Sequence, residues 1–232
     1  MTDPTPPSEL DEVVVTGQRR KTPASPFPGG VGGGGGLSGG ANQQELEEED
    51  GLPPDGAGSH PCDDPVQRKI WNADAAAAAA AAALIANAAS MNDGSSLSNR
   101  EFGVNLILGA GGQVQPQPNI SVGDPAVPGQ IPNVDIDMTG VNAGNWMGDV
   151  HNHPSGDGRL SNGEWVNFIN FVSSISATNP DRLPELAHVS VYVVVLDPTS
   201  PHGYRVYAYD RDSPPDTLGQ EVNPDAQPCP IT

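Results

Sequence analysis

The chain has 232 residues, a formal net charge of −19, 28 glycines and 25 prolines. This length fits one domain, and the share of glycine and proline predicts that part of the chain lies outside a packed core. The negative charge repels phosphates and anionic lipids, so neither nucleic acid nor membrane is an expected partner. A protein, a peptide or a small molecule is expected instead, and the oligomeric state is left open.

Residues 1–60 are predicted to be a disordered arm. The stretch from Pro23 to Gly40 is rich in proline and glycine, and Glu45 to Asp50 is a block of acids. Such segments bury too little apolar surface to offset the entropy lost on ordering. The arm has no charged-then-apolar leader and the chain no transmembrane stretch, so a cytoplasmic location is expected by default, with export as the alternative.

One short apolar run interrupts this arm. The segment from Asp11 to Arg20 reads DEVVVTGQRR and resembles the start of the plug in TonB-dependent receptors, although no barrel follows. A β-prone segment in a tail is one interpretation of its Val13 to Gly17 portion. Docking to a partner by strand addition is the other.

A helix is predicted from Pro65 to about Met91. Asp64 is a favourable N-cap, and proline suits the first helical position. Residues 75–83 are all alanine, which favours a helix but offers little area to bury. We therefore expect the helix to lie close against a neighbour, and an alanine-rich linker is the alternative. The apolar residues expected to make contact are Ile70, Trp71, Leu84 and Ile85.

Strand patterns follow this helix. The apolar run from Phe102 to Leu108 predicts one strand. Residues 113–132 hold many prolines and glycines and are expected to form a long loop that covers a site. Apolar and acidic residues alternate from Val134 to Met138, which predicts a half-exposed strand. A further strand, at 146–150, leads into two histidines.

The segment His151-Asn152-His153-Pro154 concentrates metal-binding side chains. Alternate side chains of an extended segment share a face, so His151 and His153 point the same way and Asn152 points away. Pro154 lacks a backbone N–H and disfavours a helical residue before it. The strand is therefore expected to end here, with both imidazoles at its rim.

A second helix is predicted to begin at Ser161. Apolar residues at helical spacing follow, namely Trp165, Phe168, Ile169, Val172 and Ile175. Glu164 lies one turn inside the helix, where its carboxylate can point toward the histidines. Zinc (Zn²⁺) accepts two imidazoles and one carboxylate, with a fourth position open for water. The pair Ser161 and Glu164 also fits a capping box, in which the glutamate bonds the N-cap amide instead.

Two more strands complete the predicted sheet. Residues 189–196 form an apolar, β-branched run that is typical of a central strand, and residues 204–209 are expected to pair with it. The order of elements predicts an α/β fold, a mixed central β-sheet flanked by helices, over residues 61–212. Residues 213–232, rich in proline and aspartate, are expected to be a tail.

The two cysteines, Cys62 and Cys229, bracket the predicted domain. They can form one disulfide, which requires an oxidising compartment, or remain two free thiols. A second zinc site that also uses His60 is a further alternative.

The spacing around the histidines resembles a known family. His-x-His-Pro, six residues, serine, two residues and an acid is the JAMM motif of the JAB/MPN metallopeptidases, and the wording HNHPSGD is similar to their RadC-like bacterial branch. The matching residues are His151, His153, Pro154 and Ser161. Glu164 stands where the family usually has aspartate. The resemblance covers about residues 99–210.

This resemblance implies a cytidine-deaminase-like three-layer fold and a zinc-dependent peptidase that cleaves peptide or isopeptide bonds. It implies that His151, His153 and Glu164 hold the metal and that a glutamate on an upstream strand is the general base. Glu101, at the start of the first predicted strand, is the candidate base, and Ser161 the candidate donor to the oxyanion. The implied substrate is a protein or peptide, with ubiquitin-like proteins among the candidates.

Each assignment has a plainer alternative. The histidines can be surface imidazoles, and Glu101 an exposed charge at a strand edge. Asp149 and Asp157 are rival carboxylates for the metal or the base. A JAB-like binding module without catalysis and an exported effector or toxin are the alternative functions.

Overall fold

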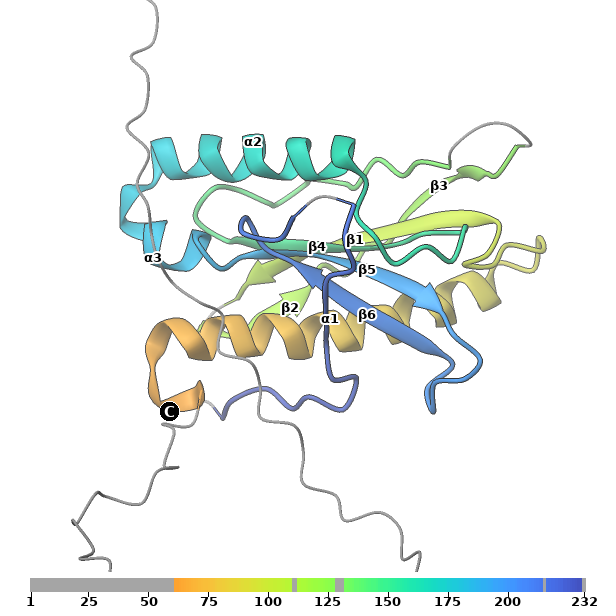
Figure 1. Ribbon diagram of the computed structural model, residues 1–232, viewed down its shortest axis with the longest axis horizontal. Coiled ribbons are helices and arrows are strands. Elements are labelled where there is room, and N and C mark those ends of the chain that lie inside the picture. The colour runs from red at the N-terminus through yellow and green to blue at the C-terminus, as the bar shows by residue number, and fades with distance from the viewer. Residues whose placement is uncertain (1–60, 110–111, 128–131, 215, 231–232) are drawn as a thin grey trace, which may run out of the picture. The chain divides into compact units, whose positions relative to one another are not determined.

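The structure, a computed structural model, describes residues 61–109, 112–127, 132–214 and 216–230. The predictions about the arm and about His60 lie outside these residues. Within the described ranges, a seven-stranded sheet lies between layers of helix (Figure 1). The elements are η1 (Pro61–Asp63), α1 (Pro65–Ser90), β1 (Arg100–Leu108), β2 (Val114–Pro116), β3 (Ser121–Pro125), β4 (Trp146–Asn152), α2 (Asn162–Thr178), η3 (Pro180–Arg182), α3 (Leu183–Leu186), β5 (Ser190–Leu196), β6 (Tyr204–Tyr209) and β7 (Gln220–Glu221).

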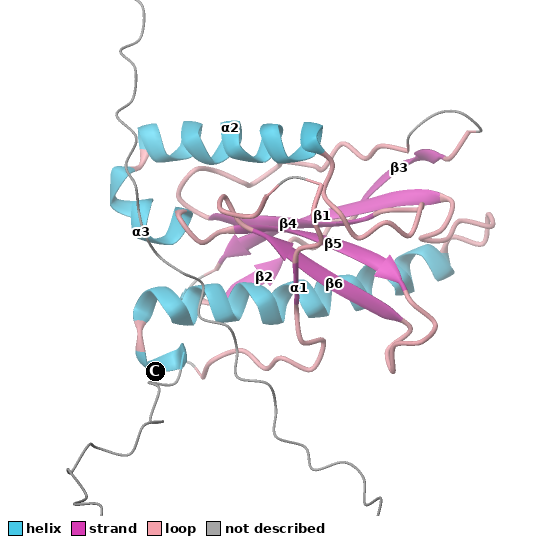
Figure 2. Cartoon of the chain, viewed as in Figure 1, coloured by secondary structure: helices cyan, strands magenta, loops and turns pink. Residues whose placement is uncertain are grey.

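The sheet is mixed. Its strands follow the order β2-β1-β4-β5-β6-β7, and β3 also pairs with β1. β4 and β5 are parallel, with α2 between them in the chain, whereas the other neighbouring pairs are antiparallel. Figure 2 shows α1 and α2 on opposite sides of these strands. The predicted α/β class, with a mixed central sheet flanked by helices, is confirmed.

α1 packs on one face of the sheet. Its N-cap is Asp64, whose Oδ1 accepts hydrogen bonds from the amides of Val66 and Gln67 at 2.8 and 2.9 Å. Ala77 and Ala80 are fully buried, because a methyl side chain lets the helix approach the strands closely. The predicted helix against a close neighbour is confirmed, and the alternative of a linker is wrong.

Among the described helices, α1 alone is long and apolar enough to cross a membrane by length and composition. Half of its most apolar window is buried inside the structure. Its buried side packs with sheet residues that include Phe102, Leu106 and Tyr192. In this fold, therefore, the apolar composition of α1 serves the packing of the domain.

α2 covers the other face of the sheet. The buried residues in this layer are Trp146, Leu160, Phe168, Val172, Ile175, Leu186, Val189, Val191, Val193, Val195, Tyr207 and Tyr209. On β1, Phe102, Val104 and Leu106 pack in the α1 layer. Because strand side chains alternate between faces, Glu101 and Asn105 lie on the α2 side. This alternation is what brings Glu101 to the same side of the sheet as the first turn of α2.

Residues 132–139 form a strap that lies across β1, and the strand predicted at Val134 to Met138 is wrong. A Cβ atom at Gly103 would come within 2.7 Å of Ile136, so glycine is what allows this approach. The strap bonds side chains instead of a neighbouring strand: Asn105 Nδ2, for example, donates to the carbonyl of Asp137 at 2.9 Å. The alternation of apolar residues here reflects packing on the face of the sheet and not backbone pairing with a neighbouring strand.

The long loop predicted at 113–132 contains two short strands. β2 is paired antiparallel to β1 with Leu106 opposite Pro116, and β3 with Phe102 opposite Val122. The expectation of a loop is therefore wrong over these two strands. Both lie beside β1 at the edge of the sheet, where a strand tolerates proline.

The segment predicted to be a tail packs on the domain over residues 216–230. β7 pairs with β6, and Val222 and Cys229 are buried. A disulfide joins Cys62 to Cys229, with Cα atoms 5.5 Å apart. This bond uses both sulfurs, which excludes the alternatives of free thiols and of a second zinc site.

Candidate metal centre

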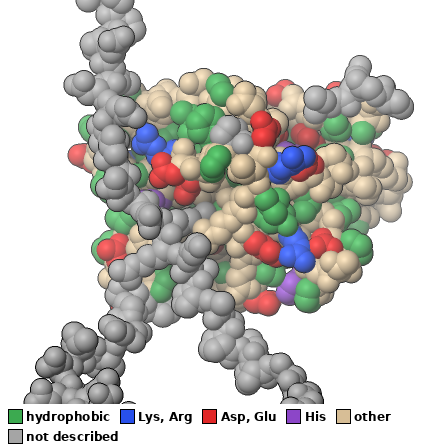
Figure 3. Space-filling model, viewed as in Figure 1, with side chains coloured by type: hydrophobic (Ala, Val, Ile, Leu, Met, Phe, Trp, Pro, Cys, Tyr) green, Lys and Arg blue, Asp and Glu red, His purple; other side chains and the backbone are tan. Residues whose placement is uncertain are grey.

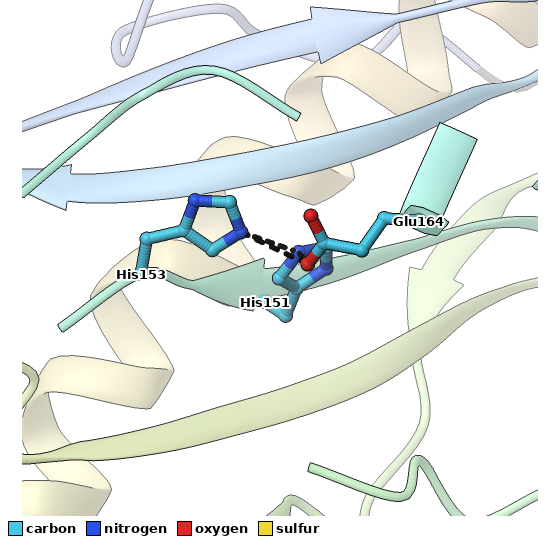
Figure 4. Close-up of side chains that lie close together, drawn as sticks. All are labelled: His151, His153 and Glu164. Atoms are coloured by element: carbon cyan, nitrogen blue, oxygen red, sulfur yellow. Dashed lines mark hydrogen bonds and ion pairs between the residues drawn. The ribbon is translucent and has the colours of Figure 1, made fainter. Parts of the chain in front are cut away.

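β4 and the first turn of α2 gather the three predicted metal ligands (Figure 4). His151 lies on β4, His153 directly follows it, and Glu164 lies in the first turn of α2. The two Nε2 atoms are 3.2 Å apart. Glu164 Oε1 lies 3.1 Å from His153 Nε2 and 3.4 Å from His151 Nε2. One ligand atom from each residue thus points to a common centre.

These separations match the edges of a tetrahedral zinc site. Zinc bonds of 2.0–2.1 Å place any two tetrahedral ligands about 3.3 Å apart. The three distances between the candidate ligand atoms run from 3.1 to 3.4 Å. The residues present therefore fit a zinc ion, and three protein ligands leave one tetrahedral position for water or substrate.

Hydrogen bonds fix which nitrogen of each histidine carries a proton. His153 Nδ1 lies 2.8 Å from the carbonyl oxygen of Asp157, which can only accept, so Nδ1 must donate. His151 Nδ1 lies 3.2 Å from Asp149 Oδ1, which acts in the same way when ionised. In both neutral imidazoles the Nε2 lone pair is then free for a metal, the arrangement that metal-binding histidines use. The alternative of surface imidazoles is wrong for His151, which is 7% exposed.

Asp149 and Asp157, the alternative carboxylates, each hydrogen-bond one of the histidines and are not themselves among the candidate metal ligands. Asp149 accepts the hydrogen bond from His151 that is described above. The Asp157 side chain pairs with Arg159 at 2.7 Å, and these bonds lower the pKa of Asp157 to about 2. Its contribution to the site is the backbone carbonyl that holds His153.

Glu164 divides its two carboxylate oxygens between two tasks. Oε2 accepts the backbone amide of Ser161 at 2.8 Å, which completes a capping box, while Oε1 faces the histidines. Capping and ligation were alternatives for this residue in the sequence. The geometry makes them compatible, because each uses a different oxygen.

The ionisable side chains of the site change one another's pKa values. Burial alone would lower the pKa of His151, but hydrogen bonds and charges from Asp149 and Glu164 outweigh it and raise this pKa to about 10. Burial likewise opposes ionisation of Glu164, yet its bonds to His151, His153 and Ser161 lower its pKa. The site therefore stabilises one positive charge among carboxylates, as a cation-binding site must.

Glu101 lies beside the ligands. It is 7% exposed, so the alternative of an exposed charge at a strand edge is wrong. Burial raises its pKa, the charges of His151 and His153 lower it, and Glu164 raises it further, with a net increase. The amide of Val134, in the strap, also donates to it. A carboxylate with a raised pKa close to the candidate metal has the properties of a general base.

Ser161 is the N-cap of α2. Its Oγ accepts the amide of Glu164 at 3.3 Å and the residue is exposed. A hydroxyl that accepts a hydrogen bond retains its own proton. While it caps α2, the Ser161 hydroxyl can therefore still donate a hydrogen bond to a bound molecule.

Asn152, between the two histidines, points to the opposite face of β4 and is fully buried. Its Oδ1 accepts the amide of Phe102 at 2.7 Å, and its Nδ2 donates to the carbonyls of Leu97 and Arg100 at 2.8 and 3.0 Å. These bonds fix the start of β1, and hence Glu101, next to His151. The sequence predicted the direction of this side chain but not its supporting role, which a polar residue inside a buried strand could have indicated.

A cavity of about 510 Å³ adjoins the ligands. Its lining includes Glu101, His151 and Glu164, and several residues that the sequence did not mark as functional, among them Asn105, Trp146 and Phe171. Phe171 and Trp146 lie in patterns that fit core packing equally well. Periodicity alone cannot distinguish the wall of a cavity from a core.

Searches with this chain against protein-family models, curated proteins and solved structures find no match. The chemistry available to the protein is therefore defined by the residues described above. They provide three candidate metal ligands, one buried carboxylate and one hydroxyl, and of these residues Glu101, His151 and Glu164 line the cavity.

Proposed function

We propose that the protein is a zinc-dependent metallopeptidase of the JAB/MPN type, which hydrolyses a peptide or isopeptide bond. The observation that carries this proposal is the triangle of ligand atoms from His151, His153 and Glu164, with sides of 3.1–3.4 Å. The JAMM-like spacing of these residues, and a mixed sheet between helices, support it. A protein or peptide is the proposed substrate, with ubiquitin-like proteins among the candidates.

Zinc held by these residues would polarise the scissile carbonyl and lower the pKa of a bound water. Glu101 would accept one proton from the attacking water as the water oxygen bonds to the carbonyl carbon. It would return that proton to the nitrogen as the carbon–nitrogen bond breaks, which yields an acid and an amine. Ser161 would donate a hydrogen bond from its hydroxyl to the carbonyl oxygen as that atom gains negative charge.

Metal binding provides the direct test. We expect the wild type to bind one zinc ion per chain, and the double variant His151→Ala/His153→Ala to bind none. His202→Ala is the matched control, because His202 lies at the surface and pairs with Asp225 away from the ligands. Isothermal titration and elemental analysis measure the stoichiometry. One zinc per chain in the double variant would overturn the site.

A zinc-holding binding module without catalysis is the second candidate function. The observation that favours it is Glu164, which caps α2 and stands where the family usually has the shorter aspartate. Assays of zinc binding and of hydrolysis on the same protein distinguish the two functions. A module binds zinc and a protein partner but hydrolyses neither unstructured peptides nor ubiquitin-like fusions.

We further infer that the protein acts in an oxidising compartment, which supports the exported effector over a cytoplasmic protein. The Cys62–Cys229 disulfide is the observation, because such bonds persist where thiols are not kept reduced. Mass measurement after thiol alkylation of protein taken from its native host tests the inference. Two alkylated cysteines in that sample would contradict it.

A further inference from the structure

The cavity beside the ligands is a groove with two defined walls. One wall is a stripe of α2 at helical spacing that starts at the ligand Glu164 and continues through Asn167, Phe168 and Phe171. The opposite wall is the strap. Its lining residues are Asn133, Val134, Asp135, Ile136 and Met138. The groove therefore leads directly away from the candidate metal centre.

The length of the groove corresponds to a short stretch of peptide. Glu164 and Phe171 are seven positions apart on α2, which is about 10 Å at 1.5 Å per residue. An extended chain advances about 3.3 Å per residue, so about three residues span this distance. A side chain attached next to the scissile bond is too short to reach Phe171.

The far end of the groove is aromatic and partly open. Trp146 is 2% exposed, and its Nε1 donates to Asn105 Oδ1 at 3.1 Å, which fixes the ring. Phe171 stands edge-on to it, with ring centroids 4.7 Å apart and planes at 87°. Phe171 and Met138 nevertheless keep 37% and 43% of their surfaces exposed. Two exposed apolar side chains around a fixed ring make a site for another aromatic group, since rings pack edge-on and sulfur contacts ring edges favourably.

The charge of the lining restricts what can lie in the groove. Its ionisable residues, apart from His151, are all acids, namely Glu101, Asp135, Asp149 and Glu164. Neither lysine nor arginine lines it. A substrate carboxylate here would be desolvated beside like charges, whereas a neutral or basic residue would not.

From these observations we propose that the groove binds an extended peptide and selects an aromatic side chain about three residues from the scissile bond, in a stretch without carboxylates. The proposal rests on the proposed hydrolase function and adds the class of substrate. Phe171 and Met138 are its specificity-determining residues, and the buried Trp146 holds the Phe171 ring in place through their edge-on contact.

The test uses the zinc-loaded full chain and fluorogenic peptides of glycine, serine and lysine that carry one phenylalanine. The phenylalanine is moved through each position on both sides of the bond that is cleaved. We expect kcat/KM to peak about three residues from that bond on one side, and to fall about 10- to 100-fold when alanine replaces phenylalanine there. Glutamate between the two positions should lower it further.

Two variants of α2 localise the effect. Phe171→Ala should bring the ratio of kcat/KM for phenylalanine peptides over alanine peptides close to one. Val166→Ala is the matched control, because Val166 is a similarly exposed apolar residue of α2 outside the lining of the groove. Equal preference in wild type and Phe171→Ala would overturn the assignment.

Binding separates failure of this proposal from failure of the hydrolase. Fluorescence anisotropy with zinc-loaded Glu101→Gln protein measures peptide affinity without turnover. Cleavage with no aromatic preference, together with equal affinity for phenylalanine and alanine peptides, would refute the groove and leave the peptidase standing. Selective binding that Phe171→Ala removes, with no cleavage by the wild type, would support the groove and refute the peptidase.

Discussion

At the scale of single residues, Glu164 both caps α2 and contributes to the candidate metal centre, and two substitutions can separate these roles. Ser161→Ala removes the cap and should cost about 1 kcal/mol of unfolding free energy, while zinc affinity is retained. Glu164→Ala removes the capping oxygen and a ligand together, so it should cost a similar amount and also weaken zinc binding. Denaturant unfolding of the metal-free protein and zinc titration measure the two effects. Equal zinc affinity in both variants would show that Glu164 only caps.

Substitution of Glu101 distinguishes an enzyme from a binding module. Glu101→Gln keeps the size of the side chain but cannot accept a proton, so hydrolysis should fall roughly 10²- to 10⁴-fold with zinc content unchanged. If the wild type is active and Glu101→Gln is equally active, Glu101 is not the general base. Asp149, which hydrogen-bonds His151, would then be the next candidate.

His151 gives the metal-free protein a pH-dependent stability. Its pKa is raised from 6.5 to about 10 because Asp149 and Glu164 outweigh the effect of burial. A raised pKa means that the folded state holds the proton more tightly than the unfolded chain. The stabilisation is therefore complete below pH 6.5 and is lost as the pH rises toward 10. Thermal unfolding in chelator should show Tm falling over this window, and less so in His151→Gln.

Zinc bound at the proposed site would compete with this proton for the same imidazole. Zinc binding should therefore release a proton, and its affinity should increase as the pH rises through the same window. Calorimetry in buffers of different ionisation enthalpy counts the protons released. Binding without proton release would contradict the coupling between the two.

At the scale of elements, β4 depends on a glycine at its centre. Gly148 has φ of +125°, and a Cβ there would lie 2.1 Å from the carbonyl oxygen of Ser190 on β5. Gly148→Ala should cost roughly 2–4 kcal/mol and weaken zinc binding, since β4 carries His151. Gly156→Ala is the control. Its φ is +74°, but nothing lies within 4 Å of an added Cβ, so this substitution costs only the strain of a positive φ. Equal losses in the two variants would show that the contact with Ser190 is unimportant.

The elements that could be predicted are those in which one physical cause dominates. α1 follows from its cap and its alanines, and β5 from its apolar run, because a central strand that is covered on both faces is apolar along its length. The strap shows the limit. Val134 and Ile136 alternate as in a strand because they pack on Gly103, a contact that the local sequence does not contain.

The candidate site was predictable to a similar extent. The spacing of His151 and His153 specifies a shared face, so this pair follows from strand geometry alone. Glu101 required the family resemblance, since fifty positions separate it from His151. The support from Asn152 and the aromatic end of the groove depend on tertiary packing, which periodicity does not encode.

At the scale of the whole molecule, the disulfide anchors the C-terminal segment to η1, just before α1. Beside it, Asn72 Oδ1 accepts the amide of Cys229 and Trp71 Nε1 donates to the carbonyl of Gln227, both at 2.7 Å. Figure 3 shows acidic side chains on several parts of the visible face, some of them beside lysine or arginine side chains.

Loss of the disulfide should lower the unfolding free energy by about 5 kcal/mol in the entropic model for a loop of this length. Cys62→Ser/Cys229→Ser tests this by denaturant unfolding, and the reduced wild type should behave like the double variant. Zinc stoichiometry should be unchanged at low denaturant, because neither sulfur lies among the metal ligands. A loss below 1 kcal/mol would show that the anchoring hydrogen bonds suffice alone.

The Cys62–Cys229 disulfide also determines whether a single cut in the backbone releases a fragment. Because it joins positions 62 and 229, the chain between them is a closed ring that contains every candidate ligand and the whole sheet. One cut in an exposed turn, such as the one between Leu196 and Tyr204, opens the ring without releasing a fragment. In a peptidase of the proposed kind, a first nick by a neighbouring copy would leave both pieces covalently joined through the disulfide. Reduction would remove that link, and a second cut inside the ring would free only the segment between the two cuts.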